Sequence, residues 1–183
     1  MFSRKRTSQL EKMKNFIRNN EISKLKNMLK RGVDPGNCLY YFDESPLELA
    51  VDVNNAEVVK LLIEYGACKT SDGNMGPFGR AFTCAIWGEK TEIVALLLEV
   101  GIDPNSYTDG GYPHTYRAID CAARKGNVEI VRMLIEKDAD PNKGIYEGSP
   151  LINAIKGARK NEEAAGEIIK LLLAHGAKLR HIF

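Results

Sequence analysis

Blocks of apolar residues recur along the chain, and each is followed by a short polar turn. The block Val58–Ile63 has apolar residues at adjacent positions and at positions three and four apart, and it precedes Gly66. This spacing predicts a helix with a broad apolar face. The other blocks precede Gly32, Gly101, Asp138 and Gly176. Glycine adopts the left-handed conformation that commonly ends a helix at little cost, and Asp tolerates it better than most residues.

A second, shorter helix is predicted before each of these blocks. Ser45 can cap such a helix, with Pro46 at a position where a missing N–H costs nothing. Ser149 and Pro150 repeat the pattern. A small residue recurs inside the helix, as Ala50, Ala85, Ala122 and Ala154. The helix-ending positions 32, 66, 101, 138 and 176 lie 34, 35, 37 and 38 residues apart, which predicts stacked helix pairs that share an apolar core.

The repeated motif resembles the ankyrin repeat, and the resemblance covers about residues 10–179. The family's Thr-Pro-Leu-His-x-Ala start is matched by Ser45–Ala50, its Ile-Val-x-Leu-Leu-Leu helix by Ile93–Leu98, and its Gly-Ala-Asp-x-Asn exit by Gly101–Asn105. The resemblance implies an all-α fold: an ankyrin-repeat α-solenoid of stacked helix-turn-helix units with hairpin-like finger loops. We expect a single domain, 1–183. Its repeats should lie at about 8–37, 38–72, 73–108, 109–142 and 143–179.

Some positions depart from the family's pattern. The histidine of the first helix is replaced by Glu48, Thr83, Asp120 and Ile152. These replacements should remove hydrogen bonds that tie neighbouring repeats together. The last repeat also carries an insertion around Ala158–Glu163, which predicts either a longer helix or an added loop.

Charge divides the chain unevenly. Residues 1–31 hold ten Lys and Arg against two acids, whereas residues 32–183 hold sixteen against twenty-two. The first helix, expected at Ser8–Asn19, carries an apolar stripe of Leu10, Met13 and Ile17. We therefore interpret the basic segment 1–31 as a solvated N-terminal cap. The alternative is a nucleic-acid or anionic-membrane binder that uses this segment. Its leading cations would be Arg4, Lys5, Arg6, Lys12, Lys14 and Arg18.

The chain carries no recognisable catalytic or metal-binding motif. Asp109 and His114 share a loop, but two ligands do not define a metal site. Cys84 and Cys121 occupy equivalent positions beside a repeated alanine, where a small buried thiol fits. We expect no enzyme activity, cofactor, metal or small-molecule substrate, and no membrane span. Free thiols indicate a reducing, cytoplasmic location, which is compatible with delivery into a host cell.

The finger loops are the best candidates for function. Three of the four are longer than the family's, and six of the seven tyrosines lie in them. Trp87, the only tryptophan, occupies a first-helix position that the family directs towards the concave face, and its counterparts Asp52, Arg124 and Lys156 are charged. The predicted partner-binding residues are Tyr40, Tyr41, Asp52, Phe78, Arg80, Trp87, Tyr107, Tyr112, His114, Tyr116, Arg124 and Tyr146. The alternative is that these aromatic residues cover helix ends and that a finger folds over Trp87.

The expected function is therefore non-catalytic protein–protein interaction by a monomer. The concave face and the extended aromatic fingers would bind a partner protein, as in an adaptor, inhibitor or effector. A toxin-neutralising immunity protein is a further alternative. Nucleic acid is the less favoured class of partner.

Overall fold

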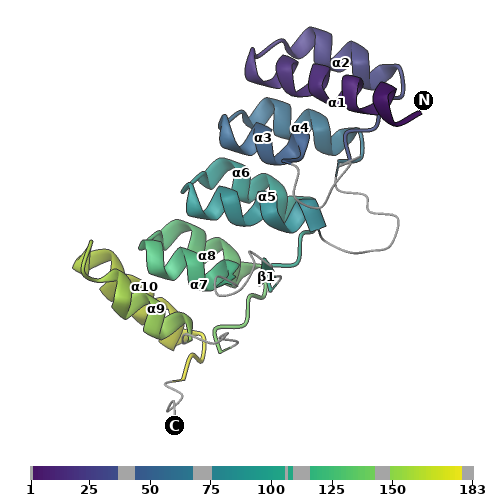
Figure 1. The fold of residues 1–183 in the computed structure, drawn as a ribbon. Helices are drawn as coiled ribbons and strands as arrows, with labels where there is room; N and C mark the ends of the chain where they lie inside the picture. Colours follow the sequence, from purple (N-terminus) through teal and green to yellow (C-terminus); the bar gives the residue numbers. More distant parts are fainter. Residues whose placement is uncertain are drawn as a thin grey trace. The chain divides into compact units, whose positions relative to one another are not determined.

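The computed structural model describes residues 2–36, 44–67, 76–105, 107–108, 116–142 and 149–178 (Figure 1). The chain divides into two compact units, Met1–Cys84 and Ala85–Phe183. Within the described residues both units are built from antiparallel helix pairs, as an all-α repeat solenoid requires. None of the described helices is both long and apolar enough to cross a membrane.

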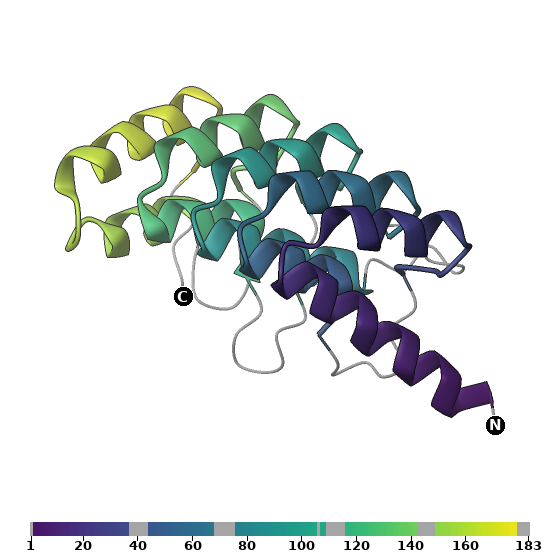
Figure 2. The ribbon, with the colours of Figure 1, turned by 90° about the horizontal axis from the view of Figure 1, so that it is seen from above.

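The first unit contains helices α1 (Phe2–Arg18), α2 (Ile22–Lys30), α3 (Pro46–Asp52), α4 (Ala56–Glu64) and most of α5 (Gly76–Trp87). Helix α1 packs against α2 and α3, and α3 packs against α4. Two rows result, with α1 and α3 in one and α2 and α4 in the other (Figure 2). Helix α1 begins at Phe2, earlier than predicted. Its predicted stripe of Leu10, Met13 and Ile17 is buried.

The second unit contains α6 (Thr91–Glu99), α7 (Ala118–Lys125), α8 (Val128–Glu136), α9 (Pro150–Gly157) and α10 (Glu162–Ala174). Helices α7 and α9 are the first helices of their repeats and pack against each other, whereas the second helices α6, α8 and α10 form another row (Figure 2). The insertion produces both predicted outcomes, because a turn at 158–160 precedes an α10 of 13 residues, compared with 9 in α8.

A finger loop begins as a short hairpin in this unit. Strands β1 (Tyr107–Thr108) and β2 (Tyr116–Arg117) pair antiparallel, with Tyr107 opposite Arg117 and Thr108 opposite Tyr116. The arrangement agrees with the hairpin-like fingers expected of this repeat. Residues 109–115 between the strands lie outside the described part of the chain.

The predicted helix ends are confirmed. Ser45 accepts a hydrogen bond from the Glu48 N–H, and the Glu48 carboxylate accepts one from the Ser45 N–H, so the two residues form a capping box. At the other end of a helix pair, Gly66 has φ +94° and Asp138 has φ +65°, so both take the left-handed conformation.

Neighbouring repeats are joined by polar contacts that were not predicted from the sequence. Glu48 Oε1 lies 2.9 Å from Arg80 Nε, and Asn153 Nδ2 donates to Asp120 Oδ1 at 3.3 Å. Glu48 and Asp120 both replace the family's histidine. Their carboxylates find new partners in the next repeat, and the prediction missed this because it considered only the histidine's own bonds.

An asparagine at the exit of two repeats forms a regular link to the following repeat. The side chain of Asn105 donates to the Asp138 carbonyl at 3.0 Å and accepts from the Asp140 N–H at 2.8 Å. Asn142 likewise donates to the Gly176 carbonyl at 2.9 Å and accepts from the Lys178 N–H at 2.8 Å. Each amide therefore satisfies two backbone groups of the next turn.

Replacing Asn142 with Ala should lower the free energy of unfolding by about 2 kcal/mol, because two hydrogen bonds of about 1 kcal/mol each are lost. Urea unfolding followed by circular dichroism measures the change. Asn161→Ala removes a side chain that accepts one bond, from the Ala164 N–H, and should cost about 1 kcal/mol. Equal losses in the two variants would contradict the two-bond role of Asn142.

The prediction that both repeated cysteines are buried is wrong for one of them. Cys121 is buried in α7, but Cys84 is exposed in α5. Burial raises the pKa of the Cys121 thiol, and the neighbouring Asp120 adds to the increase. Cys121 is therefore a packed, un-ionised thiol at neutral pH.

Candidate functional site

The predicted partner-binding residues fall into three groups. Tyr40, Tyr41, Tyr112, His114 and Tyr146 lie outside the described residues. Phe78, Tyr107 and Tyr116 lie in α5, β1 and β2, and their side chains are outside the described part of the chain. Asp52 and Arg80 belong to the first unit, and Trp87 and Arg124 belong to the second.

In the first unit, Arg80 is part of the packing between repeats. Its guanidinium contacts the carboxylate of Glu48 through Nε at 2.9 Å and through Nη2 at 3.3 Å. Glu48 is buried, and the Arg80 side chain is only 26% exposed. Two contacts in this setting fix the guanidinium in place. Asp52 is the exposed last residue of α3.

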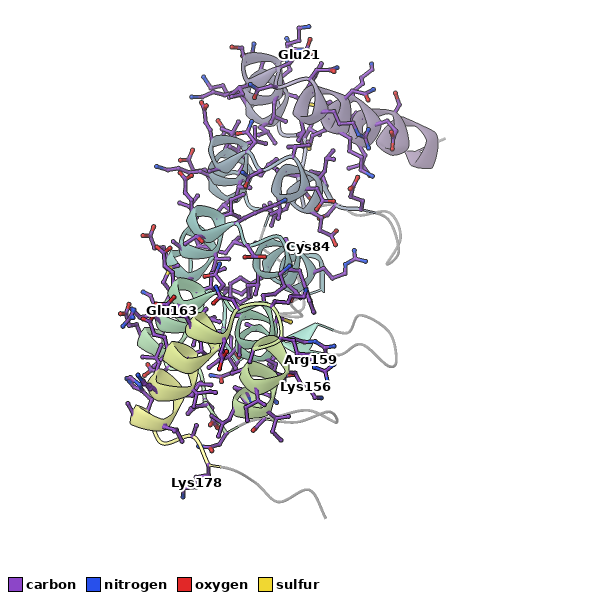
Figure 3. All side chains as sticks on the ribbon, turned by 90° about the vertical axis from the view of Figure 1, so that its left-hand side faces the viewer. Glu21, Cys84, Lys156, Arg159, Glu163 and Lys178 are labelled. Atoms are coloured by element: carbon purple, nitrogen blue, oxygen red, sulfur yellow. The ribbon has the colours of Figure 1, made fainter. Side chains whose placement is uncertain are left out.

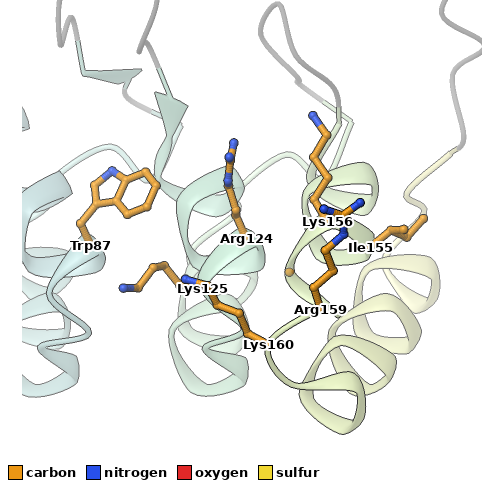
Figure 4. Close-up of a pocket in the computed structure, with 8 residues that line it drawn as sticks. Trp87, Arg124, Lys125, Ile155, Lys156, Arg159 and Lys160 are labelled. Carbon is orange, nitrogen blue, oxygen red and sulfur yellow. The ribbon is translucent and has the colours of Figure 1, made fainter.

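In the second unit, Trp87 lines a cavity of about 580 Å³ (Figure 4). The indole lies at the end of α5 and is half-buried. The remaining lining residues come from α7, α9 and the turn after α9. They are Arg124, Lys125, Ile155, Lys156, Gly157, Arg159 and Lys160. We call this cavity and its lining residues the Trp87 pocket.

The basic residues of the Trp87 pocket gather there because of where the helices end. Arg124 and Lys125 are in the last turn of α7, and Lys156 is in the last turn of α9. Arg159 and Lys160 follow in the turn 158–160. A helix C-terminus carries partial negative charge, so cations are favourable there. Because α7 and α9 pack side by side, the ends of both helices bring their cations to one place.

Lys125 has contacts that hold it beside the tryptophan. Its ammonium lies 6.0 Å from the centre of the Trp87 ring and 3.1 Å from Glu89 Oε1. A cation at this distance from an indole is attracted to the ring. The Lys125 side chain is 24% exposed. The ring of Trp87 thus has a cation within the range of attraction and also lines the cavity.

Ankyrin repeat models match the chain over most of its length. A model of three ankyrin repeats matches residues 15–108, and a model of one repeat matches residues 116–144. The first match alone spans more than half of the chain. The chain belongs to the ankyrin repeat family. A comparison with curated proteins finds no match to this ankyrin chain.

Ankyrin repeats are generally protein–protein interaction modules, and the family is typically non-catalytic. The described residues contain no group of three His, Cys, Asp or Glu side chains that could hold a metal ion. Among the described residues, clear pKa shifts occur at Asp120 and Cys121, which are buried and do not line the Trp87 pocket.

Asp120 is a carboxyl buried inside this ankyrin stack. Burial raises its pKa from 3.8 to about 7, although hydrogen bonds with Asn153 and with the backbone of Arg117, and the charge of Arg117, lower it. Asp120 is 2% exposed. The Oδ1 atom of Asn153 and the Nε atom of Arg117 are buried without a hydrogen-bond partner among the described residues. The group therefore affects stability rather than forming a site open to a ligand.

Only part of the Trp87 pocket was predicted from the sequence. Trp87 and Arg124 were predicted contacts, and Lys156 was recognised as a counterpart of Trp87, but Lys125, Arg159 and Lys160 were missed. A signal was present, because Ala123-Arg124-Lys125 recurs as Ala158-Arg159-Lys160 just before the start of the next helix. A repeated basic pair shortly before the second helix of two ankyrin repeats predicts a shared basic surface.

Proposed function

We propose that this ankyrin protein recognises another protein, without catalysis, through the first-helix side of its second unit, with Trp87 as the central contact. The finger residues selected from the sequence remain predicted contacts of the same partner. Adaptor, inhibitor and effector roles all use such recognition. The proposal concerns the binding surface that these roles have in common.

The observation that carries the proposal is a half-buried indole in the wall of a cavity of about 580 Å³. Tryptophan and arginine are enriched among the residues that dominate protein–protein affinity, and such residues lie in pockets that partner groups fill. The Lys125 ammonium, 6.0 Å from the centre of the Trp87 ring, favours this position of the ring before binding. A surface formed in advance loses less conformational entropy on binding.

Trp87→Ala should weaken binding of the partner by more than about 2 kcal/mol, which is roughly a thirtyfold rise in Kd. Partners would be captured from lysate with the wild-type protein and identified, and their Kd values would then be measured by calorimetry. The matched control is Leu173→Ala, since Leu173 on α10 is a large apolar side chain that is 52% exposed and does not line the pocket.

The Leu173 variant should keep wild-type affinity. Far-ultraviolet circular dichroism would show that each variant remains helical. If a folded Trp87→Ala variant binds every captured partner as tightly as the wild type does, this surface is not the binding site.

A further inference from the structure

The Trp87 pocket has a charge that the unit as a whole lacks. Residues 85–183 contain fourteen Asp and Glu against thirteen Lys and Arg, so the unit is nearly neutral. Five of the eight residues that line the pocket are nevertheless cationic, and none is acidic. Several cations gathered in a concave site raise the local positive potential and attract anionic groups.

The acidic residues of the unit lie mostly elsewhere. Along α7, α9 and the turns that follow them, the only acid is Asp120, which is buried. The second helices carry the exposed acids Glu92, Glu99, Glu129, Glu136, Glu162, Glu163 and Glu167. Figure 3 shows Lys156 and Arg159 on one side of the unit and Glu163 on the other. The exposed acids of these described helices therefore lie in the second-helix row, where they are mixed with the exposed cations Arg132, Lys137 and Lys170, whereas α7, α9 and the turns that follow them expose cations without acids.

The pocket also offers apolar surface between its charges. The Trp87 ring forms part of one wall, and Ile155, which is 52% exposed, forms part of another (Figure 4). Arg124 and Arg159 provide planar guanidinium groups that bind carboxylates through two hydrogen bonds, and the lysines provide compact charges. This combination suits a ligand whose carboxylates alternate with apolar side chains.

We propose that the Trp87 pocket binds an acidic peptide segment of the partner, with Asp or Glu carboxylates on the cations and an apolar side chain against Trp87 and Ile155. This inference rests on the proposed function and specifies its chemistry. A nucleic acid suits the site less well, because its backbone charge continues beyond the pocket. In a peptide, by contrast, the acidic residues can be confined to the short segment that lies in the pocket.

Binding at this site can be followed by tryptophan fluorescence, because Trp87 is the only tryptophan in the sequence. A synthetic peptide of alternating glutamate and leucine would be titrated into the full-length protein while Trp87 emission is recorded. We expect a saturable change in emission, and an affinity that falls as salt concentration rises. The same peptide with glutamine in place of glutamate should bind at least about tenfold more weakly.

Charge reversal tests the location of the site. The double variant Lys156→Glu, Arg159→Glu should raise the Kd for the acidic peptide at least about tenfold. The control double variant Lys137→Glu, Lys170→Glu makes the same change of net charge at exposed positions, just after the end of α8 and on α10, and should leave the Kd unchanged. If circular dichroism shows that the charge-reversed variant is not helical, the milder double variant Lys156→Gln, Arg159→Gln supplies the test.

Three results would overturn the inference. They are equal affinity for the glutamate and glutamine peptides, an equal loss of affinity for the acidic peptide in the pocket and control variants, and tighter binding of a single-stranded oligothymidine than of the acidic peptide. The proposed function fails separately. A captured partner whose affinity depends on Trp87 but not on Lys156 and Arg159 would retain the proposed function and reject the acidic segment.

Discussion

Asp120→Asn should stabilise the protein by a few kcal/mol near pH 8 and should remove most of the dependence of stability on pH between about 4 and 7. The native carboxyl has a pKa of about 7, compared with 3.8 for the ordinary group. Between these values the folded protein keeps the proton that the unfolded chain releases. Stability therefore falls as pH rises through this window, by about 1.4 kcal/mol per pH unit and by at most about 4 kcal/mol in total.

Asparagine has nearly the shape of the protonated carboxyl and carries no charge to bury. Its oxygen can accept from Asn153 Nδ2, as Asp120 Oδ1 does at 3.3 Å. Its amide can donate to Asn153 Oδ1, which has no partner among the described residues. The variant should consequently match the wild type near pH 4 and exceed it above pH 7.

Urea unfolding at several pH values, followed by circular dichroism, measures both profiles. Glu136→Gln is the control, because it removes an exposed carboxylate at the end of α8, and it should retain the wild-type profile. A wild-type stability that does not fall between pH 4 and pH 7, or an Asp120→Asn profile parallel to the wild-type one, would show that Asp120 is ionised in the folded protein throughout.

Much of the fold follows from the sequence because its signals are local. Ser45 caps α3, Gly66 ends a helix pair at positive φ, and Asp138 replaces glycine at the same kind of turn, all as predicted. Each of these roles depends on one residue and its immediate neighbours. The start of α1 at Phe2 was missed, because residues 2–7 lack the apolar spacing on which the prediction relied.

Features that depend on packing between repeats were harder to predict. Cys84 and Cys121 share a position in the repeat, yet only Cys121 is buried. The Trp87 pocket was found in part, since Trp87 stands out as a single tryptophan. Arg159 and Lys160 fall in an insertion that shifts them from the register of Arg124 and Lys125. Only the packing of α7 against α9 shows that both basic pairs reach one cavity.

The packing of α7 against α9 also predicts a large loss of stability for the substitution Gly157→Ala. Gly157 is the last residue of α9. A Cβ atom there would lie 2.7 Å from the Arg124 carbonyl oxygen and 3.1 Å from the Ala123 carbonyl oxygen of α7. Both contacts are with backbone, which cannot rotate away as a side chain can. Helix α9 would have to move from α7, and we expect a loss of about 2–3 kcal/mol in the free energy of unfolding.

Gly166→Ala is the matched control for this substitution. Gly166 lies inside α10, and a Cβ atom at this position would meet nothing within 4 Å. Alanine is favoured over glycine inside a helix by about 0.5–1 kcal/mol, so this variant should be more stable than the wild type. The same chemical change should therefore have opposite signs at two glycines of one repeat.

Urea unfolding of the two variants beside the wild type tests this contrast. If Gly157→Ala proved as stable as the wild type, α7 and α9 could not approach as closely as the 2.7 Å distance requires. The cations of the Trp87 pocket would then be less closely gathered, because Gly157 lies between Lys156 and Arg159 in its wall. The stability of one glycine variant thus also tests the geometry on which recognition of an acidic segment depends.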